Sequence, residues 1–231
     1  MQARRVFAYL LLICCTPFAD AADAGFYIGI EGGQSRSEMG PSDDVLIFPG
    51  GTLLDSSSDE TDQTFGLYGG YTFTKHVAIE VAYADLGEAS YAEVRDFPAF
   101  PGFPPFPPFP LPARTERQQT TSEGESLSLS LLGRYQFAAG LFLLGRAGLA
   151  IHRFESDIRV WIDDEPIPVI GGADDASAGM GVLGLGVEWS FHPRWGVRLQ
   201  AQRHFALEDE QVALAERGDV SLFTAGIGYR F

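Results

Sequence analysis

Cysteine and asparagine are almost missing from this chain. Its 231 residues include two cysteines, Cys14 and Cys15, and no asparagine. Both cysteines lie in an N-terminal segment that we expect to be removed. The mature chain would then offer no thiol for a disulfide, a metal–thiolate site or a cysteine nucleophile. The lack of asparagine excludes asparagine-linked glycosylation.

Positive charge and long apolar runs are also scarce. Lys and Arg number 16 against 31 Asp and Glu, which gives a formal net charge of −15. Because phosphate contacts require a positive field, we exclude nucleic acid as a partner. No segment reaches the ~18 consecutive apolar residues that a transmembrane helix needs. The acidic stretches lack EF-hand spacing and no glycine-rich phosphate loop occurs, so we expect no metal and no cofactor.

The N-terminus has the three-part layout of a secretory signal peptide. Arg4 and Arg5 precede an apolar run at 6–13, and small residues follow this run. We expect cleavage after Ala21, with cleavage after Ala24 as the alternative. These boundaries place the signal peptide at 1–21 and the mature chain at 22–231.

The C-terminal segment alternates in character. From Phe223 to Phe231 every second residue is apolar, and the residues between them are small or polar. A strand with a period of two places these sets on opposite faces, one suited to lipid and the other to a narrow hydrated lumen. This segment therefore favours a strand in the wall of a membrane barrel.

Eight segments of about ten residues alternate in this way, which is the length that a tilted strand needs to cross a bilayer. They lie at roughly 25–35, 63–74, 77–85, 125–137, 141–154, 178–191, 195–205 and 220–231. Short turns alternate with four long connections at about 36–62, 86–124, 155–177 and 206–219. A barrel with short periplasmic turns and long outer loops explains this order, whereas a soluble β-sandwich does not. The sequence predicts an all-β, eight-stranded, antiparallel, up-and-down transmembrane β-barrel.

Three segments carry a resemblance to a known family. They are GVEWSFHPRWGVRLQAQ at 186–202, VAIEVAYADLG at 77–87 and the terminal GYRF at 228–231. On these segments the mature chain resembles the OmpA/OmpX-like eight-stranded barrels of the outer membrane of Gram-negative bacteria. The resemblance implies a monomer in contact with outer-membrane lipid and lipopolysaccharide, and an assembly machinery that recognises Tyr229 and Phe231. Because the sequence ends at the barrel, we expect no peptidoglycan-binding domain.

The family also has a network of opposed charges inside the barrel. The matching positions here are Glu80, Arg134, Glu188 and Arg198, and the alternation adds Arg146. Each lies a few residues from a short turn, so we expect all five in one layer of the periplasmic half. An unpaired charge in a narrow lumen is costly, so these groups should pair. Two interpretations stay open: salt bridges that fix the strand register, and a gate that opens a narrow pore when the pairs exchange.

Phenylalanine recurs at every third position between about 96 and 113. The five positions are Phe97, Phe100, Phe103, Phe106 and Phe109, mostly separated by prolines. Polyproline II has three residues per turn, so the rings would line one edge of a stiff rod. Exposed aromatic surface of this size usually marks a contact, here with a host or surface protein, with lipopolysaccharide or with the barrel rim. Low-complexity drift without a partner and self-association are the alternatives.

Four histidines bear on an enzymatic function. His76 and His192 fall in short turns, while His152 and His204 approach the outer rim, where His152 could meet Glu155 or Ser156. Scattered histidines do not place a base against a nucleophile, so we expect no catalytic residue and no enzyme. The sequence predicts a structural barrel that presents surface loops for adhesion or partner binding. A gated pore is the second hypothesis and a lipid A-modifying enzyme the third.

Overall fold

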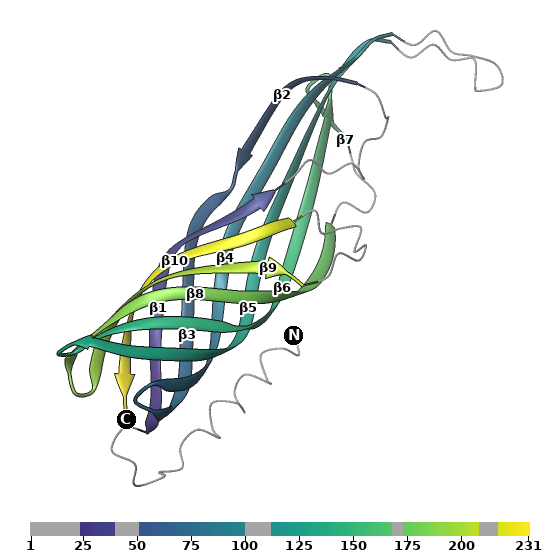
Figure 1. Cartoon of the computed structure of the whole chain (residues 1–231). Coiled ribbons are helices and arrows are strands. Elements are labelled where there is room, and N and C mark those ends of the chain that lie inside the picture. The colour runs from purple at the N-terminus through teal and green to yellow at the C-terminus, as the bar shows by residue number, and fades with distance from the viewer. Residues whose placement is uncertain (1–23, 40–50, 100–111, 168–172, 208–216) are drawn as a thin grey trace.

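The computed structural model describes residues 24–39, 51–99, 112–167, 173–207 and 217–231. Ten strands form one antiparallel sheet (Figure 1). They are β1 (Gly25–Met39), β2 (Thr52–Asp59), β3 (Thr61–Thr74), β4 (Val77–Phe97), β5 (Arg114–Ala138), β6 (Leu141–Ile162), β7 (Glu165–Ile167), β8 (Ala173–His192), β9 (Trp195–Ala206) and β10 (Arg217–Arg230). Among the described residues, none belongs to a helix that is long and apolar enough to cross a membrane.

Eight of the ten strands close into a barrel. β1 pairs with β3 on one side and with β10 on the other, and the remaining pairs follow the chain from β3 to β10 when β7 is left out. The short strands β2 and β7 lie outside this ring and pair with β4 and β6. The predicted eight-stranded, antiparallel, up-and-down barrel is confirmed.

The two faces of the wall differ as the alternation requires. On β5, Leu129 is 53% exposed on the outside, whereas its neighbours Ser128 and Ser130 are 5% and 2% exposed on the inside. An apolar exterior around a polar interior is the arrangement that a lipid bilayer imposes on a barrel. The exposed leucines therefore form part of a lipid-facing band.

Both edges of the apolar band can be located. At the outer edge Asp85, Glu125 and Arg153 are paired across β4, β5 and β6, and all three are exposed. At the short-turn end aromatic rings gather, with the Tyr229 ring 5.0 Å from that of Trp195. Such a girdle marks the interface with the headgroups, so the short turns lie on the periplasmic side.

The expected loop at 86–124 is for the most part a hairpin rather than a loop. β4 and β5 stay paired from Gly87–Gly124 as far as Phe97–Arg114, and β6 continues to Ile162. Beyond the membrane both faces of these strands are largely polar, so the hydrophobic alternation stops although the backbone pairing continues. We define the stalk as the short strands β2 and β7 together with the parts of three barrel strands that lie outside the membrane. These parts are residues 86–97 of β4, 114–124 of β5 and 154–162 of β6. Figure 1 shows the stalk extending away from the barrel.

Side chains fill the lumen of the barrel. Towards the outer end it holds two small clusters of buried apolar side chains, one of them formed by Ala150, Met180 and Val182. The other consists of Leu86, Phe154, Val220 and Leu222. Nearer the periplasmic turns the interior becomes polar and charged, and this part is the candidate site.

Candidate functional site

Glu80 on β4 is the centre of a charged layer in the periplasmic half of the lumen. Oε2 of Glu80 accepts a hydrogen bond from Nη1 of Arg198 at 2.9 Å and another from the Tyr27 hydroxyl at 2.9 Å. The Arg146 guanidinium contacts the same carboxylate. All three charged side chains are buried. Glu80 is therefore paired with two buried cations, and it accepts hydrogen bonds from Arg198 and Tyr27.

Glu188 on β8 is the second carboxylate of the layer. Its Oε1 accepts a hydrogen bond from Nη2 of Arg134 at 2.6 Å and lies 3.5 Å from Nη2 of Arg230. Nε of Arg198 lies 3.9 Å from Oε2 of Glu188, which is an ion pair without a hydrogen bond. Because Arg198 reaches both carboxylates, it links the Glu80 and Glu188 halves of the layer.

The five predicted lumen residues come from five different strands, and the structure brings them together. Glu80, Arg134 and Arg146 stand on β4, β5 and β6, and Glu188 and Arg198 are register partners on β8 and β9. Arg230 on β10 joins them through Glu188. A layer built from six strands ties the wall together across the lumen, since each ion pair fixes the relative position of two strands.

Two tyrosines, which were not predicted as site residues, support the layer. The Arg198 guanidinium lies 4.2 Å above the Tyr68 ring, a cation–π contact, and Tyr27 donates to Glu80. A Cβ on Gly29 would overlap the Tyr68 ring, and a Cβ on Gly70 would overlap the Tyr27 ring. The glycines are thus required because the narrow lumen must hold two rings beside the guanidinium groups. The sequence signal that could have identified these two tyrosines is that each inward-facing tyrosine lies opposite an inward-facing glycine.

A further carboxylate, Glu31, lies in the lumen with neutral partners. Its Oε2 accepts hydrogen bonds from Nε2 of Gln200 at 3.1 Å and from the Thr224 hydroxyl at 3.2 Å. Nη1 of Arg146 donates to Oε1 of Gln202 at 2.7 Å. Glutamine side chains therefore extend the network beyond the ion pairs.

His152 and His204 form a buried pair that the sequence analysis did not predict. Nε2 of His152 and Nδ1 of His204 are 2.7 Å apart, and both rings are buried at the outer end of the lumen. Glu155 stands three positions from His152 on β6, and it is exposed on the opposite face. The predicted proximity of His152 and Glu155 is therefore wrong. In the described part of the chain, no group of three or more His, Cys, Asp and Glu residues is arranged to hold a metal.

The structure describes one of the five repeated phenylalanines. Phe97 ends β4, is 7% exposed and has the Arg114 guanidinium 4.9 Å from its ring centre. The expectation that Phe97 presents its ring to a partner is therefore wrong, because the ring packs against Arg114 and beside Gly51. Phe100, Phe103, Phe106 and Phe109 lie outside the described residues, as do the expected signal peptide and its cleavage sites.

The two aromatics of the expected assembly signal lie at the closing seam of the barrel. The Tyr229 ring is 5.2 Å from the Phe231 ring, and the Phe231 amide donates to the Phe26 carbonyl at 3.0 Å. Phe231 is 75% exposed. Its ring is therefore accessible at the periplasmic edge.

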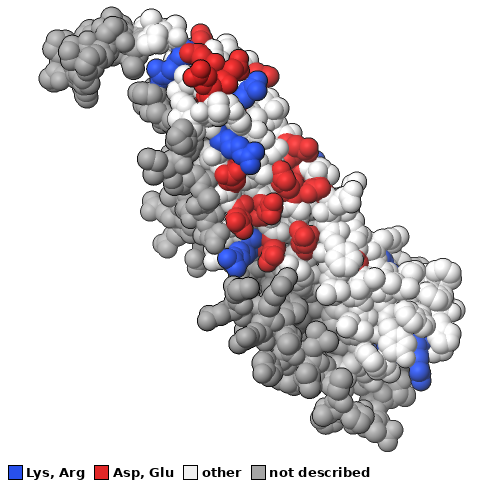
Figure 2. Space-filling view, turned by 180° about the vertical axis from the view of Figure 1, so that it is seen from behind, with Lys and Arg blue, Asp and Glu red and all other residues white. Residues whose placement is uncertain are grey.

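The exposed face of the stalk is acidic. Glu88, Glu123 and Glu155 are register partners on the adjacent strands β4, β5 and β6. Figure 2 shows acidic groups along the stalk, with a smaller number of basic groups interspersed among them. Like charges on directly opposed positions repel, so this row is not explained by sheet stability.

Comparison with known proteins gives the family. The family model of the OmpA-like transmembrane domain matches residues 21–231. Outer membrane protein P5 of Haemophilus influenzae is 24% identical over 216 residues, which cover 89% of this chain and 54% of that protein. This chain thus spans about half the length of the curated relatives it matches.

One solved structure with a TM-score above 0.5 agrees on the fold. Neisserial surface protein A is similar with a TM-score of 0.51 and 14% identity, over 90% of this chain and 99% of that one. The N-terminal barrel domain of Pseudomonas aeruginosa OprF has a TM-score of 0.48 and 13% identity, over 89% of this chain and 97% of that one. With the family model matching nearly the whole chain, this protein belongs to the family of outer-membrane β-barrels with an OmpA-like transmembrane domain.

Proposed function

We propose that this protein is a structural outer-membrane barrel whose stalk is a recognition surface for adhesion or partner binding. The observation that supports the proposal is the unbroken pairing of β4 and β5 beyond the membrane, from Gly87–Gly124 to Phe97–Arg114. At about 3.3 Å per residue, this hairpin rises roughly 35–40 Å above the apolar band. A barrel that only strengthens the membrane has no need of such an extension.

The chemistry of the stalk narrows the kind of partner. Its exposed face carries the row of Glu88, Glu123 and Glu155, so a partner with basic side chains fits it. The phenylalanine-rich segment that joins β4 to β5 is a second candidate contact. An acidic surface predicts binding that weakens as salt is raised, whereas an aromatic contact predicts binding that does not.

Two deletions separate these contacts. Replacing residues 88–123 by Asn-Gly joins the register partners Gly87 and Gly124 through a two-residue hairpin and removes most of the stalk, including Glu88 and Glu123 of the acidic row. Replacing residues 98–113 in the same way joins Phe97 to Arg114 and removes only the phenylalanine-rich segment. Adherence of expressing bacteria to host cells is measured for both, and heat-modifiable migration in gels shows that the barrel still folds. Undiminished adherence by the variant that lacks most of the stalk would refute the proposal.

A gated pore is the second candidate, and the position of Arg198 favours it. Nη1 of Arg198 is 2.9 Å from Glu80, and its Nε is 3.9 Å from Glu188, so a small shift could exchange the two pairs. The layer fills the lumen with buried side chains, so ions would pass only after such an exchange. Planar-bilayer recordings test this. Arg198→Ala should raise the conductance, and a silent variant contradicts the pore.

The remaining partners are inferred from the surface. Outer-membrane lipid and lipopolysaccharide surround the apolar band of a monomeric barrel. The assembly machinery recognises Phe231, whose ring is exposed at the periplasmic edge, together with Tyr229. These inferences rest on the exposed apolar wall and on the position of the two rings.

A further inference from the structure

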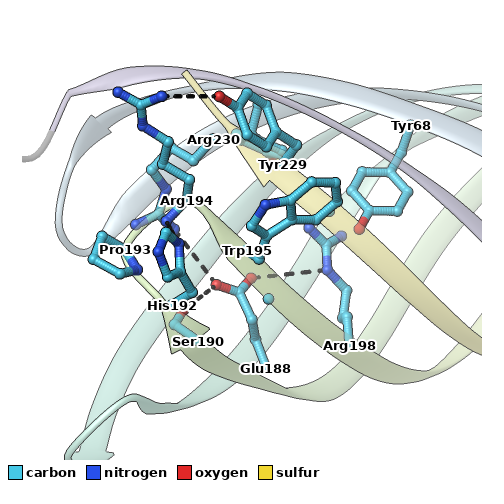
Figure 3. Close-up of a pocket in the computed structure, with 13 residues that line it drawn as sticks. Tyr68, Glu188, Ser190, His192, Pro193, Arg194, Trp195, Arg198, Tyr229 and Arg230 are labelled. Atoms are coloured by element: carbon cyan, nitrogen blue, oxygen red, sulfur yellow. Dashed lines mark hydrogen bonds and ion pairs between the residues drawn. The ribbon is translucent and has the colours of Figure 1, made fainter.

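A pocket opens at the periplasmic end of the barrel, between the β8–β9 turn and the end of β10. Arg194 and Trp195 form its turn side, Tyr229 and Arg230 its β10 side, and Tyr68 and Arg198 lie deeper in the lumen (Figure 3). It is separate from the stalk and lies on the other side of the membrane. Glu188, Arg198 and Arg230 belong to the charged layer, whereas neither adhesion nor the pore accounts for Arg194, Trp195 and Tyr229.

The lining carries more positive than negative charge. Three guanidinium groups, those of Arg194, Arg198 and Arg230, share the pocket with one carboxylate, Glu188. That carboxylate is held most closely by Arg134, at 2.6 Å, and Arg134 is not part of the lining. In a chain with a net charge of −15, an arginine-rich pocket is therefore a local reversal of sign.

One of these donors has no acceptor. The Arg198 side chain is 4% exposed, and its Nε–H has no hydrogen-bond partner among the described residues. The nearest carboxylate oxygen, Oε2 of Glu188, is 3.9 Å away, which is too far for a hydrogen bond. A buried donor without an acceptor is unfavourable, so an oxygen from a bound group would satisfy it.

The turn side of the pocket is held in place before any ligand arrives. The Arg194 amide donates to Nδ1 of His192 at 3.2 Å, and the Arg194 carbonyl accepts from the Arg230 amide at 2.8 Å. Nη1 of Arg194 lies 3.3 Å from the Tyr229 hydroxyl. A pocket whose donors are already oriented loses little freedom on binding, which favours affinity.

We propose that this pocket binds a phosphate group. Planar guanidinium forks match the oxygens of phosphate, and three of them line this pocket. Trp195 and Tyr229 place the opening within the aromatic girdle, at the depth of the phosphates of the inner leaflet. The phosphate could belong to a phospholipid headgroup or to a soluble phosphate ester in the periplasm, and the test below distinguishes these sources.

The test compares two single substitutions in the refolded full barrel. Arg194→Gln removes one pocket charge from an exposed turn and leaves the buried layer intact. Lys75→Gln removes a charge from the exposed β3–β4 turn at the same end of the barrel, but Lys75 does not line the pocket. Each protein, in micelles of an uncharged sugar detergent, is titrated with inorganic phosphate and separately with dihexanoyl phosphatidylglycerol. Amide NMR shifts of Gly196 and Gly228, which line the pocket, report binding.

Saturable shifts at these amides are expected for the wild type and for Lys75→Gln, with affinity at least tenfold weaker in Arg194→Gln. A response to the lipid alone assigns the site to a headgroup, and a response to inorganic phosphate alone assigns it to a soluble ester. A response to both assigns it to phosphate from either source. The absence of saturable shifts with both probes overturns the proposal. Equal weakening in the two variants also overturns it, because a non-specific effect of net charge would then suffice.

Discussion

Glu80→Gln gives the sharpest test of the charged layer. Glutamine has nearly the same shape as glutamate, but it removes the negative charge that faces the guanidinium groups of Arg146 and Arg198. Both arginines stay buried, so the variant removes the carboxylate that Arg146 contacts and leaves Arg198 with the longer 3.9 Å ion pair to Glu188. Breaking a buried ion pair by removing one partner costs about 3–5 kcal/mol. We therefore expect Glu80→Gln to lower the free energy of unfolding by about 4 kcal/mol.

The measurement is reversible urea unfolding of the barrel in lipid vesicles. With an m-value of roughly 2 kcal/mol per molar urea, the midpoint should fall by about 2 M. Glu31→Gln is the matched control, since Glu31 is buried in the same lumen but accepts hydrogen bonds from the neutral Gln200 and Thr224. Its loss should be nearer 1–2 kcal/mol. Equal losses for the two variants would refute the view that ion pairs hold the layer together.

Three further predictions concern the seam, the stalk and the lumen. Phe231→Ala should reduce the yield of folded, heat-modifiable barrel in cells several-fold while leaving refolding in detergent unchanged; an unchanged cellular yield speaks against an assembly signal. Burial raises the pKa of Glu116, whose carboxylate oxygens accept no hydrogen bond from the described residues, so the folded stalk holds its proton more tightly than the unfolded chain. The stability of the stalk should therefore fall as pH rises above about 4.5, the ordinary value, and Glu116→Gln should remove this dependence in proteolysis assays. Gly29→Ala should cost about 1–3 kcal/mol because a Cβ there overlaps the Tyr68 ring, while Gly145→Ala, with open space around it, should cost less than 0.5 kcal/mol.

The sequence was sufficient for the wall of the barrel because lipid imposes a regular pattern. Strands such as β5 alternate between leucine outside and serine inside, and the short turns fix their order. The same alternation predicts that five charged residues face the lumen, and their similar distance from the short turns predicts one depth for all of them. They are Glu80, Arg134, Arg146, Glu188 and Arg198. Which arginine meets which carboxylate could not be deduced, since Glu80 and Arg198 are 118 positions apart and meet only through the tilt of the strands.

The stalk and the histidine pair escaped prediction for related reasons. Outside the bilayer no solvent contrast separates the two faces of β4 and β5, so strand and loop look alike in the sequence. His152 and His204 stand on β6 and β9, with β8 between them. Their contact depends on the distance across the lumen between β6 and β9. Neither strand's sequence indicates this distance.

The continuity of β4 and β5 from the membrane to the tip of the stalk has a mechanical consequence. A partner pulling on the tip would load two strands in parallel along their length, and these strands are the barrel wall itself. Extracting them would require the ladders with β2, β3 and β6 to slide apart, so that many hydrogen bonds must break together rather than one after another. The stalk is thus anchored in the wall, so a load applied at its tip would be carried by the barrel itself.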